Sequence, residues 1–178
     1  MRAVSRRVLL CCVLLALAAS CHGSAPVGSS IPALNASDAP LLPATADGLP
    51  DMNLDGYRRL LAELRGTPAV VNFWGSWCAP CRDEAPDLAT LSDRYGSKVQ
   101  FLGIDILELH RSDGVAFVHE FHWRFPSVFD PSAVIRNGLG YVGQPVTLFY
   151  DGNGSLVDQW SGPITPSRFR QGLDRILP

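Results

Sequence analysis

Cys78 and Cys81, separated by two residues, are the side chains of this sequence best suited to chemistry. The attacking species in disulfide exchange is the thiolate, so the pKa of one of the two thiols must be lowered. The sequence predicts that a helix begins at about Cys78, where unpaired backbone N–H groups and the helix dipole favour an anion. Cys81 follows about one turn later and can close a disulfide with Cys78. We therefore predict that Cys78, the end expected to face solvent, is the nucleophile and that Cys81 is the resolving thiol.

Metal and haem sites fit the cysteine pair less well. A structural zinc site requires four ligands, and the sequence has no second CxxC and no close Cys/His pair. His119 and His122 share a predicted helix face, but both can equally be surface or packing residues. Covalent haem attachment needs a histidine directly after the second cysteine, where Arg82 stands. We therefore predict no metal ligands.

The first 21 residues have the organisation of a secretory signal peptide. Three arginines occur within the first seven residues, and residues 8–19 form an unbroken apolar run of twelve. That run is shorter than the roughly 20 residues that a membrane-spanning helix needs. Residues 17–21 are similar to a bacterial lipobox, although the leucine lies one place further from the cysteine than usual. We predict lipidation of Cys21, and cleavage after Ala18 is the alternative.

The five cysteines support a chemical role for the pair. Cys11 and Cys12 lie in the predicted signal peptide, and lipidation would occupy Cys21. The mature domain then keeps only Cys78 and Cys81. A disulfide across so short a loop removes little entropy from the unfolded chain, so in an oxidising compartment a chemical role is favoured over a structural one.

Composition divides the remainder of the chain into two parts. Residues 22–50 are rich in Pro, Ala, Ser and Gly without a sustained period, and they predict a flexible tether. Residues 51–178 carry the periodic apolar segments of a compact domain. The net charge of −2 offers no excess of cations to replace phosphate counterions, so no nucleic-acid partner is predicted.

Strand and helix patterns alternate along the predicted domain. Asp55, Asp113 and Thr165 are the predicted caps of three helices. Residues 69–74 form an apolar run suited to a buried central strand. The other predicted elements are helices at about residues 78–95, 130–138 and 166–177, and strands at about residues 99–105, 127–129, 146–150 and 156–160. Asp-Gly-Asn-Gly at residues 151–154 marks a hairpin between the last two strands. This order predicts an α/β fold with a mixed sheet.

Four motifs then occur in order. They are Val-Val-Asn-Phe-Trp-Gly-Ser-Trp-Cys-Ala-Pro-Cys-Arg-Asp-Glu-Ala-Pro at residues 70–86, Phe-Pro-Ser-Val-Phe-Asp at 125–130, Gly-Gln-Pro-Val-Thr at 143–147 and Asp-Gly-Asn-Gly at 151–154. Together they resemble the TlpA/ResA/DsbE-like branch of the thioredoxin superfamily, over about residues 51–178. The resemblance implies a thioredoxin fold: a mixed central β-sheet sandwiched by helices, with a central insertion and an N-terminal extension of the TlpA/ResA type.

The resemblance also implies a substrate-binding surface around the cysteines. Pro145 occupies the place of the family's cis-proline, which faces the cysteine pair and lets the preceding backbone, at Gln144, pair with an extended substrate. An ordinary loop proline before an edge strand is the alternative. Trp77, Ala79 and Pro80 would complete this surface beside the cysteines.

The resolving cysteine must release a proton. Thioredoxins proper carry a buried aspartate at the place of Asn72, and asparagine cannot accept that proton. Glu84, one turn after Cys81 on the same predicted helix, could serve instead, as a glutamate at this place is thought to tune the cysteines of related proteins. The alternative is a solvated glutamate on a polar helix face. Asp105 and Glu108 are weaker candidates for one flank of the cleft.

The resemblance implies a protein thiol–disulfide oxidoreductase. The Cys78–Cys81 couple stores two electrons, so no cofactor besides this redox-active disulfide is expected. The implied partners are cysteine-containing exported proteins, including apocytochrome c, and a membrane electron donor or acceptor. The expected location is the outer face of a bacterial cell membrane through a lipid anchor, with a secreted or periplasmic protein as the alternative. Reduction for cytochrome c maturation and Dsb-type oxidation both fit.

Two functions of a different class fit the motifs less well. The first is a copper-handling protein of the same fold without redox turnover, although copper chaperones of this fold use a CxxxC pair with a distal histidine. The second is a peroxidase of the peroxiredoxin type, which expects a threonine where Gly75 stands.

Overall fold

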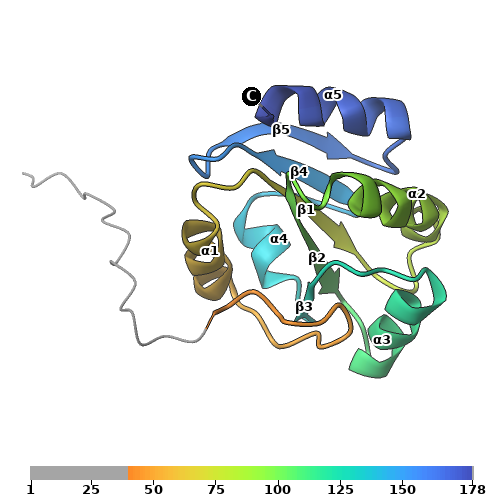
Figure 1. Cartoon of the computed structure of the whole chain (residues 1–178). Helices are drawn as coiled ribbons and strands as arrows, with labels where there is room; N and C mark the ends of the chain where they lie inside the picture. Colours follow the sequence, from red (N-terminus) through yellow and green to blue (C-terminus); the bar gives the residue numbers. More distant parts are fainter. Residues whose placement is uncertain (1–39, 178) are drawn as a thin grey trace, which may run out of the picture. The chain divides into compact units, whose positions relative to one another are not determined.

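The computed structural model describes residues 40–177 (Figure 1). The predicted signal peptide, the candidate lipidation residue Cys21 and most of the predicted tether lie outside the described residues. None of the helices in residues 40–177 combines the length and the hydropathy that a bilayer crossing requires. The elements in chain order are α1 (Leu54–Glu63), β1 (Ala69–Trp74), α2 (Ala79–Tyr95), β2 (Gln100–Ile106), α3 (Arg111–Glu120), β3 (Ser127–Asp130), α4 (Val134–Gly138), β4 (Val146–Tyr150), β5 (Leu156–Ser161) and α5 (Pro166–Ile176).

The strands of the described chain form a mixed sheet in the order β3-β2-β1-β4-β5 (Figure 1). β1 lies in the middle, where it pairs in parallel with β2 and antiparallel with β4. All six of its residues are buried, which explains its largely apolar sequence. β3 pairs in parallel with β2, and β5 pairs antiparallel with β4 at the opposite edge. The predicted mixed α/β sheet is therefore confirmed.

Helices cover both faces of this sheet, because alternate residues of β1 point to opposite sides. Val70 and Trp74 belong to a core formed with α2, α3 and α5, whose buried members include Leu88, Phe117 and Phe169. Val71 and Phe73 belong to a second core formed with α1 and α4, whose buried members include Tyr57 and Ile135. The cysteine pair is part of the first core. The side of the sheet that carries α2, α3 and α5 is therefore the side on which the site is built.

Two predicted helix caps are wrong. Asn53, not Asp55, caps α1, and its side chain accepts a hydrogen bond from the N–H of Gly56 at 2.8 Å. Asp55 lies in the first turn instead, where its charge suits the helix dipole. His110 occupies the cap position of α3 without a side-chain hydrogen bond, and Asp113 lies in the first turn of that helix.

The packed chain begins before residue 51, where the sequence placed the start of the domain. Leu49 is fully buried in the first core, although it belongs to the segment that its composition assigned to the tether. The N–H of Leu41 donates to the Glu63 carboxylate at 3.0 Å. Leu41 and Leu49 therefore both contact the domain, and composition alone does not reveal these contacts.

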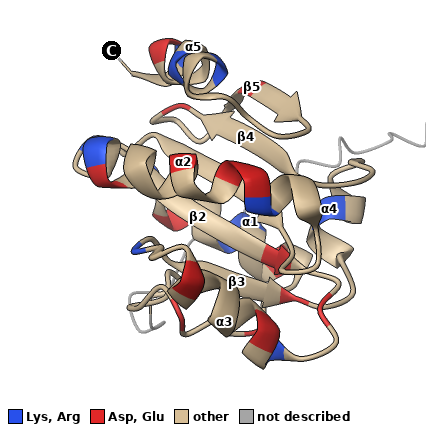
Figure 2. Cartoon of the chain, turned by 90° about the vertical axis from the view of Figure 1, so that its right-hand side faces the viewer, with Lys and Arg blue, Asp and Glu red and all other residues tan. Residues whose placement is uncertain are grey.

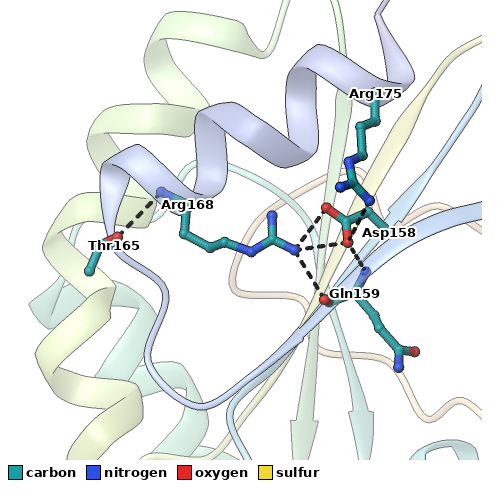
Figure 3. Close-up of polar contacts among 5 residues, drawn as sticks. All are labelled: Asp158, Gln159, Thr165, Arg168 and Arg175. Atoms are coloured by element: carbon teal, nitrogen blue, oxygen red, sulfur yellow. Dashed lines mark hydrogen bonds and ion pairs between the residues drawn. The ribbon is translucent and has the colours of Figure 1, made fainter.

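The edge strand β5 is tied to α5 by ion pairs (Figure 3). The guanidinium of Arg168 donates to both carboxylate oxygens of Asp158, each at 2.8 Å, and also to the backbone carbonyl of Gln159. Arg175 approaches the same carboxylate at 3.5 Å from the next turns of α5. Thr165 caps α5, as predicted, by accepting the N–H of Arg168. These contacts hold the start of α5, and with it the preceding residue Ile164, against the sheet.

Candidate active site

The cysteine pair lies where β1 passes into α2. Cys78 is the N-cap residue of α2, and its backbone N–H donates to the carbonyl of Gly75 at 3.1 Å. Its sulfur accepts the backbone N–H of Cys81 at 3.2 Å, and Pro80 lies in the first turn, where a missing N–H removes no helical bond. Cys78 and Cys81 form a disulfide with an S–S distance of 2.02 Å. At the N-terminus of α2, the N–H of Cys81 therefore points at the Cys78 sulfur, as the sequence predicted.

Cys78 and Cys81 differ little in solvent exposure in this oxidised form. Cys78 is 3% exposed and Cys81 is 1% exposed. The expectation that Cys78 faces solvent therefore has little support from exposure. Its assignment as the nucleophile rests on its place at the helix start and stays a prediction.

The predicted substrate-binding residues fall into an exposed group and a buried one. Trp77 is 52% exposed and Ala79 is exposed as well, whereas Pro145 is buried. The Trp77 indole lies so close to Gly75 that a Cβ there would meet its Nε1 at 2.8 Å. The Gln144–Pro145 peptide bond is cis, as the resemblance implies.

Strand pairing brings the cis bond near the cysteine turn. Val146, which follows Pro145, pairs with Phe73, the residue before the last one of β1. Pro145 therefore lies at the end of β1 that leads into the turn to Cys78. The side chain of Gln144 accepts a hydrogen bond from Arg136 on α4 at 2.8 Å, a contact that the sequence did not indicate.

Glu84 is buried at 2% exposure and faces Asn72. Asn72 on β1 donates to one carboxylate oxygen at 2.8 Å, and the N–H of Ile164 donates to the other at 2.6 Å. Burial, which disfavours the charged form, raises the pKa of Glu84 to about 7 against the lowering effect of these two hydrogen bonds. The alternative of a solvated glutamate is therefore excluded. A carboxyl group with this pKa can exchange a proton near neutral pH.

Two further carboxyl groups flank the cysteine turn from β2. Acidic residues occur at the carboxyl ends of β2 and β3, the edge from which the turn emerges (Figure 2). Asp105 is fully buried, and burial together with the nearby Glu108 carboxylate raises its pKa to about 9. Both oxygens of Glu108 accept hydrogen bonds from Ser76, one from the backbone N–H and one, at 3.0 Å, from the hydroxyl. Glu108 therefore contacts the cysteine turn through Ser76, a partner that the sequence did not signal.

The part of the chain that the structure describes contains no group of potential metal ligands. Over residues 40–177, no three Cys, His, Asp or Glu side chains lie together as a metal ion would need. His119 instead contacts Asp47 at 3.0 Å on the surface.

Known proteins with similar sequences are named as thiol-disulfide oxidoreductases. The thiol-disulfide oxidoreductase ResA of Geobacillus thermodenitrificans (strain NG80-2) is 29% identical over 185 residues, covering 99% of this chain and 97% of the relative. A protein of the same name from Bacillus anthracis is 30% identical over 130 residues, covering 71% of this chain and 73% of the relative. These relatives confirm the resemblance to the ResA-like branch.

Solved structures agree with the sequence relatives. A secreted disulfide oxidoreductase of Mycobacterium tuberculosis, described as homologous to E. coli DsbE, has a TM-score of 0.58 and 27% identity, covering 64% of this chain and 84% of that chain. A DsbF homologue of Corynebacterium diphtheriae has a TM-score of 0.59 and 28% identity, covering 64% of this chain and 74% of that chain. The thioredoxin-like fold is therefore confirmed. The model of the AhpC/TSA family matches residues 35–159, and the chain accordingly belongs to the AhpC/TSA family.

Proposed function

We propose that this protein is a thiol–disulfide oxidoreductase whose Cys78/Cys81 couple exchanges electrons with cysteines of exported proteins. The observation that carries the proposal is the disulfide at the start of α2, with the buried Glu84 carboxyl group one turn further along the same helix. The names of the ResA relatives and of the secreted disulfide oxidoreductase support the same chemistry.

The reaction transfers two electrons between the cysteine pair and a substrate disulfide. In the reducing direction, the Cys78 thiolate attacks one sulfur of a substrate disulfide, and the other substrate sulfur leaves as a thiolate. Cys81 then attacks Cys78 in the mixed disulfide, giving up its proton to the Glu84 carboxylate, and the second substrate thiolate leaves. Two electrons have passed to the substrate, and the protein holds the Cys78–Cys81 disulfide. Because the dithiol carries both electrons, the reaction needs no organic cofactor, and oxidation of a substrate is the same sequence in reverse.

The substrate would lie across the exposed side of the cysteine turn. Trp77 and Ala79 offer apolar surface on one side of Cys78, with Pro80 beside them. Gln144 and Pro145 would supply the backbone edge that pairs with an extended peptide around its cysteine.

An extracytoplasmic location is part of the proposal. It is supported by the apolar N-terminal segment and by the relative from Mycobacterium tuberculosis that is described as secreted. Lipidation of Cys21 would hold the domain near a membrane electron donor or acceptor. Suitable partners are exported proteins with cysteine pairs, apocytochrome c among them.

Trapping the mixed disulfide tests this function. Cys81→Ser should accumulate a mixed disulfide with a peptide that contains a disulfide, visible by mass spectrometry without reductant, because the resolving thiol is gone. Cys78→Ser should lose exchange and trap nothing. Trapping by Cys78→Ser alone would reverse the two roles, and exchange that survives both substitutions would refute the function.

The reduction potential of the pair would then choose the direction of electron flow. A value near thioredoxin's, about −270 mV, would favour a reductant of exported proteins. A value between about −120 and −180 mV, as in DsbA and protein disulfide isomerase, would favour an oxidant or isomerase.

A further inference from the structure

Asp105 lies buried beneath α3 on the face of the sheet that carries the cysteine pair. The carboxyl group is fully buried, and within residues 40–177 neither of its oxygens has a hydrogen-bond partner of regular geometry. Gly114 of α3 covers it so closely that a Cβ at that position would collide with Oδ2 of Asp105. Glycine at this position of α3 therefore leaves the space that the Asp105 carboxyl group occupies.

Two other buried polar groups share this face without a partner among the described residues. They are the indole N–H of Trp74 and the hydroxyl of Ser127. Trp74 pairs with Asp105 across β1 and β2, so both side chains point to the same side of the sheet. Ser127 pairs with Gly103, two residues before Asp105 on the same face. The surroundings of Asp105 thus contain uncharged polar groups that form no hydrogen bond with it among the described residues.

The charged groups that face Asp105 favour its neutral form. Glu108 and Asp113 are both acidic and raise its pKa, in addition to the larger effect of burial. Arg111 acts in the opposite direction but is engaged elsewhere: it donates to Asp51 at 2.7 Å and to the carbonyl of Leu49. An isolated carboxylate in such a place would cost far more free energy than a carboxylic acid.

Glu108 has the opposite environment three residues later. Its two oxygens accept the N–H and the hydroxyl of Ser76. Ser76 lies two residues before Cys78, in the turn that also contains the Gly75 carbonyl bonded to the Cys78 N–H. Glu108 therefore holds the cysteine turn as a hydrogen-bond acceptor, whereas the neighbouring Asp105 accepts no such hydrogen bond among the described residues.

We propose that Asp105 holds a proton and is a positioning residue which keeps Glu108 on the cysteine turn. The proposal rests on the thiol–disulfide exchange proposed above, since the turn matters only if Cys78 reacts. Ionisation of Asp105 would place a buried negative charge beside the Glu108 oxygens that accept the Ser76 donors. That charge would repel these electron-rich oxygens, so Glu108 would release Ser76 and the Cys78 thiolate would form less readily. Exchange should therefore have an alkaline limit that is set by Asp105.

The pH profile of exchange tests this consequence. Reduced protein is mixed with oxidised glutathione, and the rate of mixed-disulfide formation at Cys78 is followed from about pH 6 to about pH 10. The wild-type rate should fall below that of Asp105→Asn as pH passes through the pKa of Asp105. Asp105→Asn cannot ionise, so its rate should hold where the wild-type rate falls. Asp174→Asn, which removes an exposed acid on α5, is the control and should keep the wild-type limit. An identical alkaline limb in wild type and Asp105→Asn would overturn the proposal.

Infrared spectroscopy provides a readout that does not depend on activity. At about pH 8 the Glu84 carboxyl is largely ionised, so a carbonyl band of a buried carboxylic acid in the wild type should include Asp105. Asp105→Asn should remove that part of the band and Asp174→Asn should retain it. If the band kept its full intensity in Asp105→Asn, a proton on Asp105 would be refuted, whether or not the protein is active. A protein that shows the band and exchanges no disulfide would instead refute the proposed function.

Discussion

Asn72 on β1 donates its side-chain amide to the Glu84 carboxylate on α2 over 2.8 Å. The other oxygen of that carboxylate accepts the backbone N–H of Ile164, just before α5. Three elements thus meet at one carboxyl group that lies one helical turn from Cys81. Burial outweighs the two donors and raises the pKa of Glu84 to about 7, so the group can take up and return a proton close to neutral pH.

Glu84→Gln should slow the step in which Cys81 attacks the mixed disulfide. Below about pH 7 the wild-type Glu84 is protonated and cannot accept the Cys81 proton, so the wild-type rate should rise as pH passes through the pKa of Glu84. Glutamine does not titrate, so that rise should vanish and the rate above the pKa should drop by about 10²-fold. Stopped-flow measurement of substrate release against pH checks this.

The matched control for Glu84→Gln is Asp87→Asn. Asp87 lies on the same helix but is exposed, so its removal should leave the profile unchanged. A Glu84→Gln profile that keeps the wild-type inflection would limit Glu84 to a structural role.

Asn72→Asp should move the inflection of the same profile to higher pH. The change replaces a hydrogen-bond donor with a second buried carboxyl group facing Glu84, and two such groups cannot easily ionise together. We expect a shift of about one pH unit or more. The lost hydrogen bond should also lower the free energy of unfolding by about 1–3 kcal/mol, measured by urea denaturation. An inflection that stays in place would show that Asn72 does not influence the titration of Glu84.

Trp74 and Trp77 should respond in opposite ways to truncation. Trp74 is fully buried and stacks on Phe117 with ring centroids 4.4 Å apart, so Trp74→Ala should cost about 3–5 kcal/mol of stability. Trp77 is half exposed beside Cys78, so Trp77→Ala should change stability by only about 0.5 kcal/mol. Its effect should instead be a higher KM for a cysteine-containing peptide. Equal peptide kinetics in Trp77→Ala and wild type would remove Trp77 from the substrate surface.

Local sequence patterns predicted most of the strands and helices. β1 has the predicted bounds because a continuous run of apolar residues can only be buried on both faces of a sheet. The β4–β5 hairpin and the Thr165 cap of α5 were also predicted, since each depends on a few adjacent residues. The caps of α1 and α3 were misplaced because several polar residues near each helix start could equally serve.

Long-range contacts explain what the sequence could not reveal about the site. The cysteine pair and the cis bond before Pro145 belong to short motifs and were predicted. The burial of Glu84 depends on the N–H of Ile164, 80 residues away, and no local pattern encodes that contact. The contact between Glu108 and Ser76 depends on a loop in which Leu107 adopts a positive φ of 56°, a conformation that leucine does not signal.

The stability of the wild type should fall with rising pH because of Asp105. Its carboxyl group titrates near 3.8 when unfolded and near 9 when folded, so between these values the native state binds a proton that the unfolded state releases. The free energy of unfolding therefore decreases as pH rises through this window. Asp105→Asn should be more stable than wild type at about pH 8, and the gain should shrink towards pH 4. Calorimetric Tm values at several pH values check this, with Asp174→Asn as the control. A constant difference in Tm across the window would contradict the raised pKa of Asp105.

Gly114→Ala should destabilise the protein although alanine is the better helix former. In an open helix position the change gains up to about 1 kcal/mol, but here the new methyl group would collide with the Asp105 carboxyl group. We expect a net loss of about 1–3 kcal/mol in urea denaturation. Gly56→Ala is the control, because the atom its Cβ would meet, at 2.7 Å, is the sulfur of the flexible Met52 side chain. In an Asp105→Ala background the loss at Gly114 should largely disappear, since the colliding group is gone. If the two substitutions were instead additive, the Asp105 carboxyl group would not lie beneath α3, and its neutral form would lose its structural basis.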